Sequence, residues 1–200
     1  MNRNDSAGSF DKAALRRLAL DRRNALSDEE RTAASRAVVG NAAPLLLSLL
    51  PGTVGFTWPM GSECDIRPLI ELAVSNGATA ALPTIVERTR LLFRAYRPGD
   101  RLVPAGFGTS EPVPESPAVR PDILIVPMVA FDRTGMRLGY GKGYYDRAIA
   151  ELGVEGRAPR LIGAAFAAQE VDAIPHEPHD VRLEWIVTEA GIRDFRTGKD

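Results

Sequence analysis

The stretch PDILIVPMVAFDRTGMRLGYGKGYYDR, residues 121–147, decides the expected fold of this 200-residue chain. It opens with an apolar run, Ile123 to Val126, which is typical of a buried strand. The chain then passes glycines at positions 135, 139, 141 and 143 and enters a helical pattern from about Gly143 to Leu152. A strand, a glycine-rich turn and a helix in this order indicate an α/β fold.

The glycine-rich turn is a candidate anion site. Glycines let the backbone approach a ligand closely, and the start of the following helix offers unpaired N–H groups to an anion. Lys142 lies among these glycines and could reach a phosphate. The segment is not a Walker A loop, because Met136 and Gly143 occupy its first glycine and its final Ser/Thr positions. It also lacks the GxGxxG spacing of a dinucleotide fingerprint. A tight structural turn explains the same glycines, so both interpretations stay open.

Outward from this stretch, helical and strand-like patterns alternate. A first helix is expected over residues 11–26, capped by Asp11. A second is expected over residues 27–50, opened by the capping-box pair Ser27 and Glu30. A third is expected over residues 65–76, capped by Asp65. Further strands are expected over residues 53–58, 79–82, 91–96, 161–166 and 184–188. The patterns predict an α/β three-layer sandwich with a mostly parallel central sheet.

The domain plan is simple. Residues 1–10 are expected to be disordered, residues 11–192 to form a single catalytic domain, and residues 193–200 to form a loosely ordered tail. The stretch 98–121 is rich in Pro and Gly and reads as a long loop, either functional or mobile.

Composition excludes several classes of protein. The 25 basic and 26 acidic residues nearly balance, which argues against binding to nucleic acid through its phosphates. The single cysteine, Cys64, excludes an intrachain disulfide and a cysteine-based metal framework. No apolar run is long enough to cross a bilayer, and the first residues lack the apolar core of a signal peptide. We expect a cytoplasmic protein.

Other candidate residues have ordinary explanations beside functional ones. Lys12, Arg16 and Arg23 fall on one face of the first predicted helix, where a solvated basic face is the plainer interpretation. His176 and His179 lie three apart near Asp180 and suggest a metal site, although surface histidines are commoner in such a loop. Cys64 fits a small buried hydrophobe better than a nucleophile.

Several motifs together carry a resemblance. They are LGYGKGYYDR at 138–147 after AFDRTGMR, KAALR at 12–16, SDEER at 27–31, GFGTSEP at 106–112 and HD at 179–180. In order and spacing, over roughly residues 11–189, the chain resembles the 5-formyltetrahydrofolate cyclo-ligase family, also called methenyltetrahydrofolate synthetases. The resemblance implies an α/β fold related to sugar-phosphate isomerases and CoA transferases.

The resemblance also implies site residues. Contacts with ATP are implied for Lys12, Ala13, Ala14, Leu15, Arg16, Arg137, Leu138, Gly139, Tyr140, Gly141, Lys142, Gly143, Tyr144 and Tyr145. The folate substrate is expected beside Trp58, Glu63, Tyr140, Gly141, Lys142, Gly143 and Tyr144. Magnesium is expected on Asp146 and Asp180, and the catalytic cations are expected to be Lys142, Arg137 and Lys12.

The implied reaction is the closure of 5-formyltetrahydrofolate to 5,10-methenyltetrahydrofolate, with ATP as co-substrate and Mg²⁺ as cofactor. We expect a monomer that acts on small molecules, with neither nucleic acid nor membrane as partner. Two alternatives remain: a sugar-phosphate isomerase or CoA transferase on a similar scaffold, and a non-catalytic relative that binds folate or nucleotide.

Overall fold

The computed structural model describes residues 12–154, 156, 158–177 and 180–196. The expected cap Asp11, the expected disorder of residues 1–10 and the last four residues of the expected tail lie outside the described residues. No helix in the described part of the chain is both long enough and apolar enough to cross a membrane.

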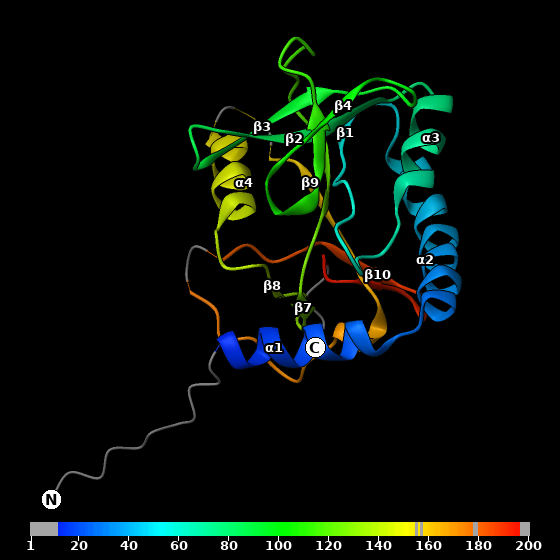
Figure 1. Cartoon of the computed structure of the whole chain (residues 1–200), viewed down its shortest axis with the longest axis vertical. Helices are drawn as coiled ribbons and strands as arrows, with labels where there is room; N and C mark the ends of the chain where they lie inside the picture. The colour runs from blue at the N-terminus through cyan, green and yellow to red at the C-terminus, as the bar shows by residue number, and fades with distance from the viewer. Residues whose placement is uncertain (1–11, 155, 157, 178–179, 197–200) are drawn as a thin grey trace, which may run out of the picture.

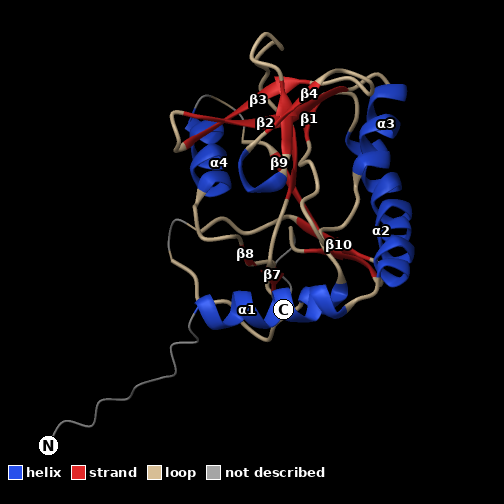
Figure 2. Ribbon diagram, in the orientation of Figure 1, coloured by secondary structure: helices blue, strands red, loops and turns tan. Residues whose placement is uncertain are grey.

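A seven-stranded sheet forms the centre of the described structure (Figures 1 and 2). Its strand order is β11-β10-β9-β6-β1-β2-β3. The five inner strands run parallel, and the two edge strands β11 and β3 are antiparallel to their neighbours, which confirms the predicted mostly parallel sheet. The strand bounds are β1 Thr53–Gly55, β2 Thr79–Val86, β3 Arg90–Ala95, β6 Ile123–Val126, β9 Arg160–Ala164, β10 Trp185–Thr188 and β11 Gly191–Asp194.

Helices cover both faces of the sheet, and the central strand β6 explains why. Successive side chains on a strand point to opposite faces. Ile123 and Ile125 join the apolar cluster that includes α2 (Asp28–Leu49) and α3 (Arg67–Ser75). Leu124 and Val126 join the cluster that includes α4 (Tyr144–Val154) on the other face. Figure 1 shows α2 and α3 on one side of the sheet and α4 on the other, so the fold has the predicted three layers.

Helix α1 (Lys12–Ala25) packs apart from these layers, against a small hairpin that sequence patterns did not predict. The hairpin pairs β7 (Ala130–Phe131) with β8 (Arg137–Leu138). Leu15 and Ala19 are buried in one cluster with apolar hairpin residues. Asp132 holds the turn, because its buried carboxylate accepts hydrogen bonds from the backbone N–H groups of Thr134 and Met136. The glycine-rich loop therefore begins directly after a hairpin whose turn is fixed by hydrogen bonds.

Of the predicted helix caps, the structure confirms that of α2 and contradicts that of α3. The capping box is confirmed: the Ser27 hydroxyl accepts from the Glu30 N–H at 3.2 Å, and the Glu30 carboxylate accepts from the Ser27 N–H at 2.8 Å. The predicted cap at Asp65 is wrong, because α3 begins at Arg67 with Ile66 as the capping residue. The Asp65 carboxylate instead accepts from the Arg67 N–H at 3.1 Å and pairs with the Arg67 guanidinium.

The expected long loop contains short regular elements. The stretch 98–121 holds β4 (Leu102–Pro104), the 3₁₀ turn η1 (Gly106–Gly108) and β5 (Ser110–Pro112), with β4 and β5 paired antiparallel. A second 3₁₀ turn, η2, covers Ala167–Gln169. Strand β11 continues two residues past the expected domain boundary at residue 192.

Candidate active site

A cavity opens where the strand order reverses. Strand β1 has β2 on one side and β6 on the other, all parallel, so their carboxyl ends meet at one edge of the sheet. Ligands of open α/β sheets bind at such switch points. The cavity at this edge is lined by Arg23, Thr57, Glu63, Cys64, Ile66, Ile125, Val126, Pro127, Met128, Ala164 and Gln169.

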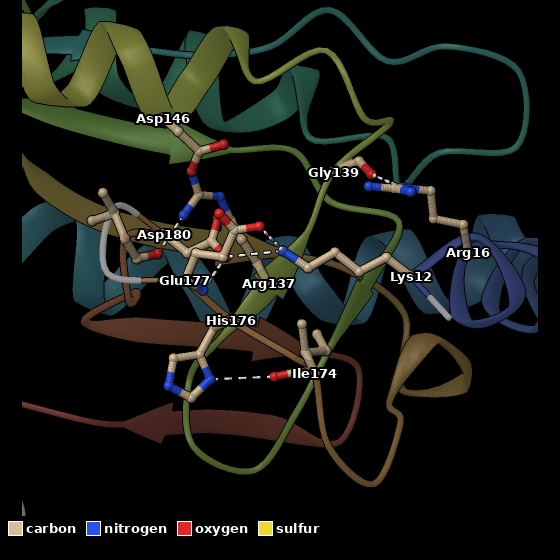
Figure 3. A network of polar contacts seen from close by, with 10 residues as sticks. Lys12, Arg16, Arg137, Gly139, Asp146, Ile174, His176, Glu177 and Asp180 are labelled. Atoms are coloured by element: carbon tan, nitrogen blue, oxygen red, sulfur yellow. Dashed lines mark hydrogen bonds and ion pairs between the residues drawn. The ribbon is translucent and has the colours of Figure 1, made fainter. Parts of the chain in front are cut away.

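The basic face of α1 is turned toward the glycine-rich loop and the segment around Asp180 rather than into solvent. Lys12 Nζ lies 3.1 Å from an Asp180 carboxylate oxygen. Arg16 Nε donates to the Gly139 carbonyl at 2.7 Å (Figure 3). Arg23, the third residue of this face, is buried. These contacts exclude the interpretation of the face as merely solvated, and they bring together four predicted site residues, Lys12, Arg16, Gly139 and Asp180.

Arg137 and Asp146 form a partly buried ion pair beside that face. The Arg137 side chain is 4% exposed, and its Nη2 donates to Asp146 Oδ1 at 2.5 Å. Its Nη1 donates to the Val181 carbonyl. Burial lowers the pKa of Arg137, while the carboxylate of Asp146 opposes that shift. An arginine stays protonated at any ordinary pH, so the site holds a fixed cation here.

The two carboxylates expected to hold magnesium lie in one polar network with Lys12 and Arg137 (Figure 3). Asp180 Oδ2 also accepts from the Glu177 N–H at 2.8 Å. Among the described residues, no group of three or more His, Cys, Asp or Glu side chains could hold a metal ion. Magnesium bound to phosphates needs only one or two carboxylates, so the two aspartates fit that role, which stays a prediction.

Two of the loop's glycines adopt backbone conformations that side chains resist. Gly141 has φ of +90° and Gly143 has φ of +65°. A Cβ on Gly143 would lie 2.9 Å from Arg147 Nη1. The Arg147 guanidinium donates to the carbonyls of Lys142 and Thr89, each at 2.9 Å, so it ties the loop to the β2–β3 turn. The Lys142 residue itself is exposed.

Tyr140 connects the loop to the cavity. Its hydroxyl donates to Glu63 Oε1 at 2.6 Å and accepts from Arg23 Nη1 at 3.2 Å. The other Glu63 oxygen accepts from the Met60 N–H at 2.9 Å. Burial, assisted by the negative charge of Glu63, raises the pKa of Tyr140 to about 12. The phenol therefore stays protonated and keeps a hydrogen to donate.

The other predicted aromatic residues are placed differently. Trp58 is partly buried against the core cluster, with the Arg67 guanidinium 5.5 Å from its ring centroid. The Tyr144 hydroxyl donates to the Arg88 carbonyl at 2.9 Å. The Tyr145 hydroxyl is buried, and burial raises the pKa of Tyr145, although the Thr57 side chain opposes that shift.

The remaining predicted residues either pack inward or stand at the surface. Leu15 and Leu138 are buried in the cluster between α1 and the hairpin, so their expected contacts with ATP stay predictions that concern the backbone. Ala13 and Ala14 are exposed on α1. Cys64 is buried, and burial raises the pKa of its thiol to about 12, which fits a small hydrophobe and not a nucleophile.

The histidines give no support for a metal site of their own. His176 Nδ1 lies 3.3 Å from the Ile174 carbonyl oxygen. His179 lies outside the described residues.

Sequence reasoning missed two parts of the site. It placed Arg23 on the basic face but did not connect it to Tyr140 and Glu63, because nothing in the sequence indicates that pairing. It also missed the turn at Arg88 and Thr89, whose carbonyls are held by Tyr144 and Arg147. Both are contacts between segments far apart in the chain.

Fold and site together define a class of protein. Cations from α1, a glycine-rich loop, two carboxylates and an adjoining cavity meet at the carboxyl edge of a parallel sheet. This arrangement is typical of an enzyme that handles a phosphate-bearing small molecule.

The chain belongs to the 5-formyltetrahydrofolate cyclo-ligase family, whose sequence model matches residues 9–189. It is 32% identical over 186 residues to the 5-formyltetrahydrofolate cyclo-ligase of Mycolicibacterium smegmatis, covering 88% of this chain and 93% of that one. The cyclo-ligase of Escherichia coli is 31% identical over 180 residues, covering 87% and 98%.

A solved structure agrees. The solution structure of Aquifex aeolicus 5,10-methenyltetrahydrofolate synthetase matches with a TM-score of 0.77 at 33% identity, covering 94% of this chain and 95% of that one. The resemblance inferred from the motifs is thereby confirmed.

Proposed function

We propose that this chain catalyses the ATP-dependent closure of 5-formyltetrahydrofolate to 5,10-methenyltetrahydrofolate, with release of ADP and phosphate. Family membership supports the reaction. One structural observation carries the proposal. The cationic face of α1 meets the glycine-rich loop at Arg16 and Gly139, directly beside the cavity that Glu63 lines.

The chemical obstacle is the formyl oxygen, which leaves poorly from an amide-like carbon. Transfer of the γ-phosphoryl group of ATP to that oxygen makes it part of a phosphate. N10 of the folate then attacks the formyl carbon, the C–O bond breaks, phosphate leaves and N10 loses its proton. The substrate supplies both attacking atoms, so no protein nucleophile is needed. The buried, protonated Cys64 agrees with that chemistry.

The protein's part is positioning and charge neutralisation. Lys12, Arg16 and Arg137 surround the start of the glycine-rich loop, and Lys142 stands exposed within it. We assign the triphosphate to this group of cations. A cation directed at a transferring phosphoryl group contributes about 10³-fold or more in rate.

Magnesium fits the same place. Asp146 and Asp180 would hold it together with the phosphates, and their oxygens are the ligands that Mg²⁺ prefers. The bound ion would neutralise charge on the phosphate oxygens. Arg137 pairs with Asp146 and Lys12 with Asp180, and these ion pairs keep both carboxylates in place.

The folate is assigned to the mouth of the cavity at the carboxyl ends of β1 and β6, because the enclosed space of about 10 Å³ is too small for the ring itself. Glu63 would accept hydrogen bonds from the ring's N–H groups, and we expect Trp58 and Tyr144 to offer flat apolar surfaces to the ring.

The test is the absorbance of the methenyl product with purified protein, measured with and without Mg-ATP. Product that forms only with ATP supports the proposal. Product that fails to form, although both ligands bind, would identify a binding module. Turnover of a sugar phosphate or a CoA ester without ATP would identify one of the other enzyme classes. Light scattering during gel filtration tests the expected monomer.

A further inference from the structure

Arg23 is an unusual arginine. It is 5% exposed, whereas Arg17 and Arg22 on the same helix are exposed. Among the described residues it forms no ion pair, and its partners are two neutral oxygens. Nε donates to the Ser62 hydroxyl at 3.0 Å, and Nη1 donates to the Tyr140 hydroxyl at 3.2 Å. Burying a charge without a carboxylate partner is costly, so this placement calls for a reason.

The direction of the hydrogen bonds around Arg23 is fixed. A guanidinium can only donate, so the Tyr140 hydroxyl must accept from Arg23 and send its own hydrogen to Glu63. The carboxylate of Glu63 therefore keeps its role as an acceptor. The carboxylate and the guanidinium are held on either side of a single phenol oxygen.

Arg23 and Glu63 also line the same cavity. Two of the three guanidinium nitrogens are engaged, and Nη2 has no hydrogen-bond partner in the described part of the chain. A carboxylate oxygen has two lone pairs, so Glu63 can accept further bonds beside those from Tyr140 and Met60. The cavity thus offers a strong acceptor next to a strong donor.

This pair matches one edge of a reduced pterin. An amino group, a ring N–H and a ring carbonyl stand in a row along that edge. We infer that Arg23 is a specificity-determining residue, which donates from Nη2 to the ring carbonyl while Glu63 accepts from the neighbouring N–H groups. This inference rests on the proposed function, because it assumes that the folate ring lies over the mouth of this cavity.

The geometry also gives α1 a double role. Lys12 and Arg23 lie about 16 Å apart along the axis of one helix, at 1.5 Å per residue. One end of α1 would serve the triphosphate and the other the pterin. A single rigid element would then set the distance between the two substrates.

The test compares two ligands. One is 5-formyltetrahydrofolate, and the other is its 4-amino-4-deoxy counterpart, in which an amino group replaces the ring carbonyl and the adjacent ring nitrogen loses its hydrogen. Wild-type protein should prefer the first, because two donors would face each other in the second. Arg23→Met should weaken binding of the first about 10- to 100-fold, as expected for one hydrogen bond to a charged group. Binding of the second should change much less, so the selectivity ratio should fall by about the same factor, and the preference that remains would come from Glu63. Calorimetric titration without ATP measures both Kd values.

Two variants separate direct contact from other effects. Arg17→Met is the matched control on the exposed side of α1 and should leave both Kd values unchanged. Tyr140→Phe removes the bridging hydroxyl and keeps the Arg23 donor, so the preference for the carbonyl ligand should persist. If Tyr140→Phe abolished that preference as fully as Arg23→Met does, Arg23 would act only through Tyr140 and the inference would be overturned.

Other outcomes are equally decisive. Equal losses for both ligands in Arg23→Met would assign the residue a purely structural role. If Arg23→Met does not fold by circular dichroism, Arg23→Gln carries the test: its amide can donate or accept, so the selectivity ratio should fall, and an unchanged ratio there overturns the inference. Failure of the proposed function looks different: wild-type protein would then form no methenyl product with ATP, whatever Arg23 does to binding.

Discussion

Replacing Asp146 by asparagine should destabilise the protein and remove most of its turnover. Asparagine has nearly the same shape as aspartate, so packing is preserved and only the charge is lost. Arg137 would keep its bond to the Val181 carbonyl but lose the carboxylate 2.5 Å from its Nη2. A guanidinium that is 4% exposed would then keep only the weaker attraction of Asp180.

The size of the effect follows from the burial of the two partners. Removing one partner of a buried ion pair costs about 3–5 kcal/mol. The Asp146 side chain is 31% exposed, so water screens the pair in part and the cost should fall somewhat below that range. We expect a loss of about 2–3 kcal/mol in the free energy of unfolding. With a urea m-value of about 2–3 kcal/mol/M, the midpoint should fall by about 1 M.

Urea denaturation followed by circular dichroism measures this loss, and the methenyl assay measures turnover on the folded fraction. Glu151→Gln is the control, because it breaks the Arg90–Glu151 pair, whose side chains are 49% and 43% exposed. Exposed pairs contribute about 0–1 kcal/mol, so this midpoint should barely move.

A double variant sharpens the test. Arg137→Met in combination with Asp146→Asn removes the stranded charge, so it should be more stable than Asp146→Asn alone. If Asp146→Asn had wild-type stability and wild-type turnover, neither the ion pair nor the assigned magnesium role would stand. Lost stability with full turnover would leave the pair a structural role only.

Three further predictions concern single side chains. Lys142→Ala should unfold at the wild-type urea midpoint, since the residue is exposed, but lose most of its turnover; full turnover would remove Lys142 from the mechanism. Lys12→Ala should raise the ATP concentration needed for half-maximal rate, and an unchanged requirement would limit Lys12 to its ion pair with Asp180. Burial raises the pKa of Cys64 to about 12, so at pH 8 thiol labelling of folded protein should be about a thousandfold slower than in urea. The same shift makes stability fall as pH rises above the unfolded thiol's pKa of about 8.5, which urea midpoints at pH 8 and 10 would detect.

Local sequence patterns predicted both ends of β6 correctly, because this strand is buried along its whole length. The run Ile123 to Val126 matches β6 at both ends, because every residue in it is apolar and buried. Strand β2 continues past its predicted end at Leu82, although Pro83 follows. Pairing with β1 ends at Ala81, so the missing N–H of Pro83 interrupts no bond on that side. The extent of β2 thus depends on where its neighbour stops.

The site was predicted only in part, because local patterns do not reveal contacts between distant segments. Helical spacing put Lys12, Arg16 and Arg23 on one face, and their contacts with Asp180, Gly139 and Tyr140 agree. Spacing alone cannot reveal what that face meets, since Gly139 and Asp180 lie more than a hundred residues away. The two-residue strands of the β7–β8 hairpin were hidden for another reason: they are too short to show any periodicity.

The packing of α1 fixes the position of its cationic face relative to the glycine-rich loop. Leu15 and Ala19 are buried against the hairpin, and Arg16, between them in sequence, reaches the Gly139 carbonyl just after β8 ends. The same hairpin carries Arg137 in β8. Apolar burial therefore sets the spacing between the charged groups of helix and loop. A core substitution such as Leu15→Ala should therefore change the position of Arg16 relative to the glycine-rich loop, even though the leucine itself is buried against the hairpin.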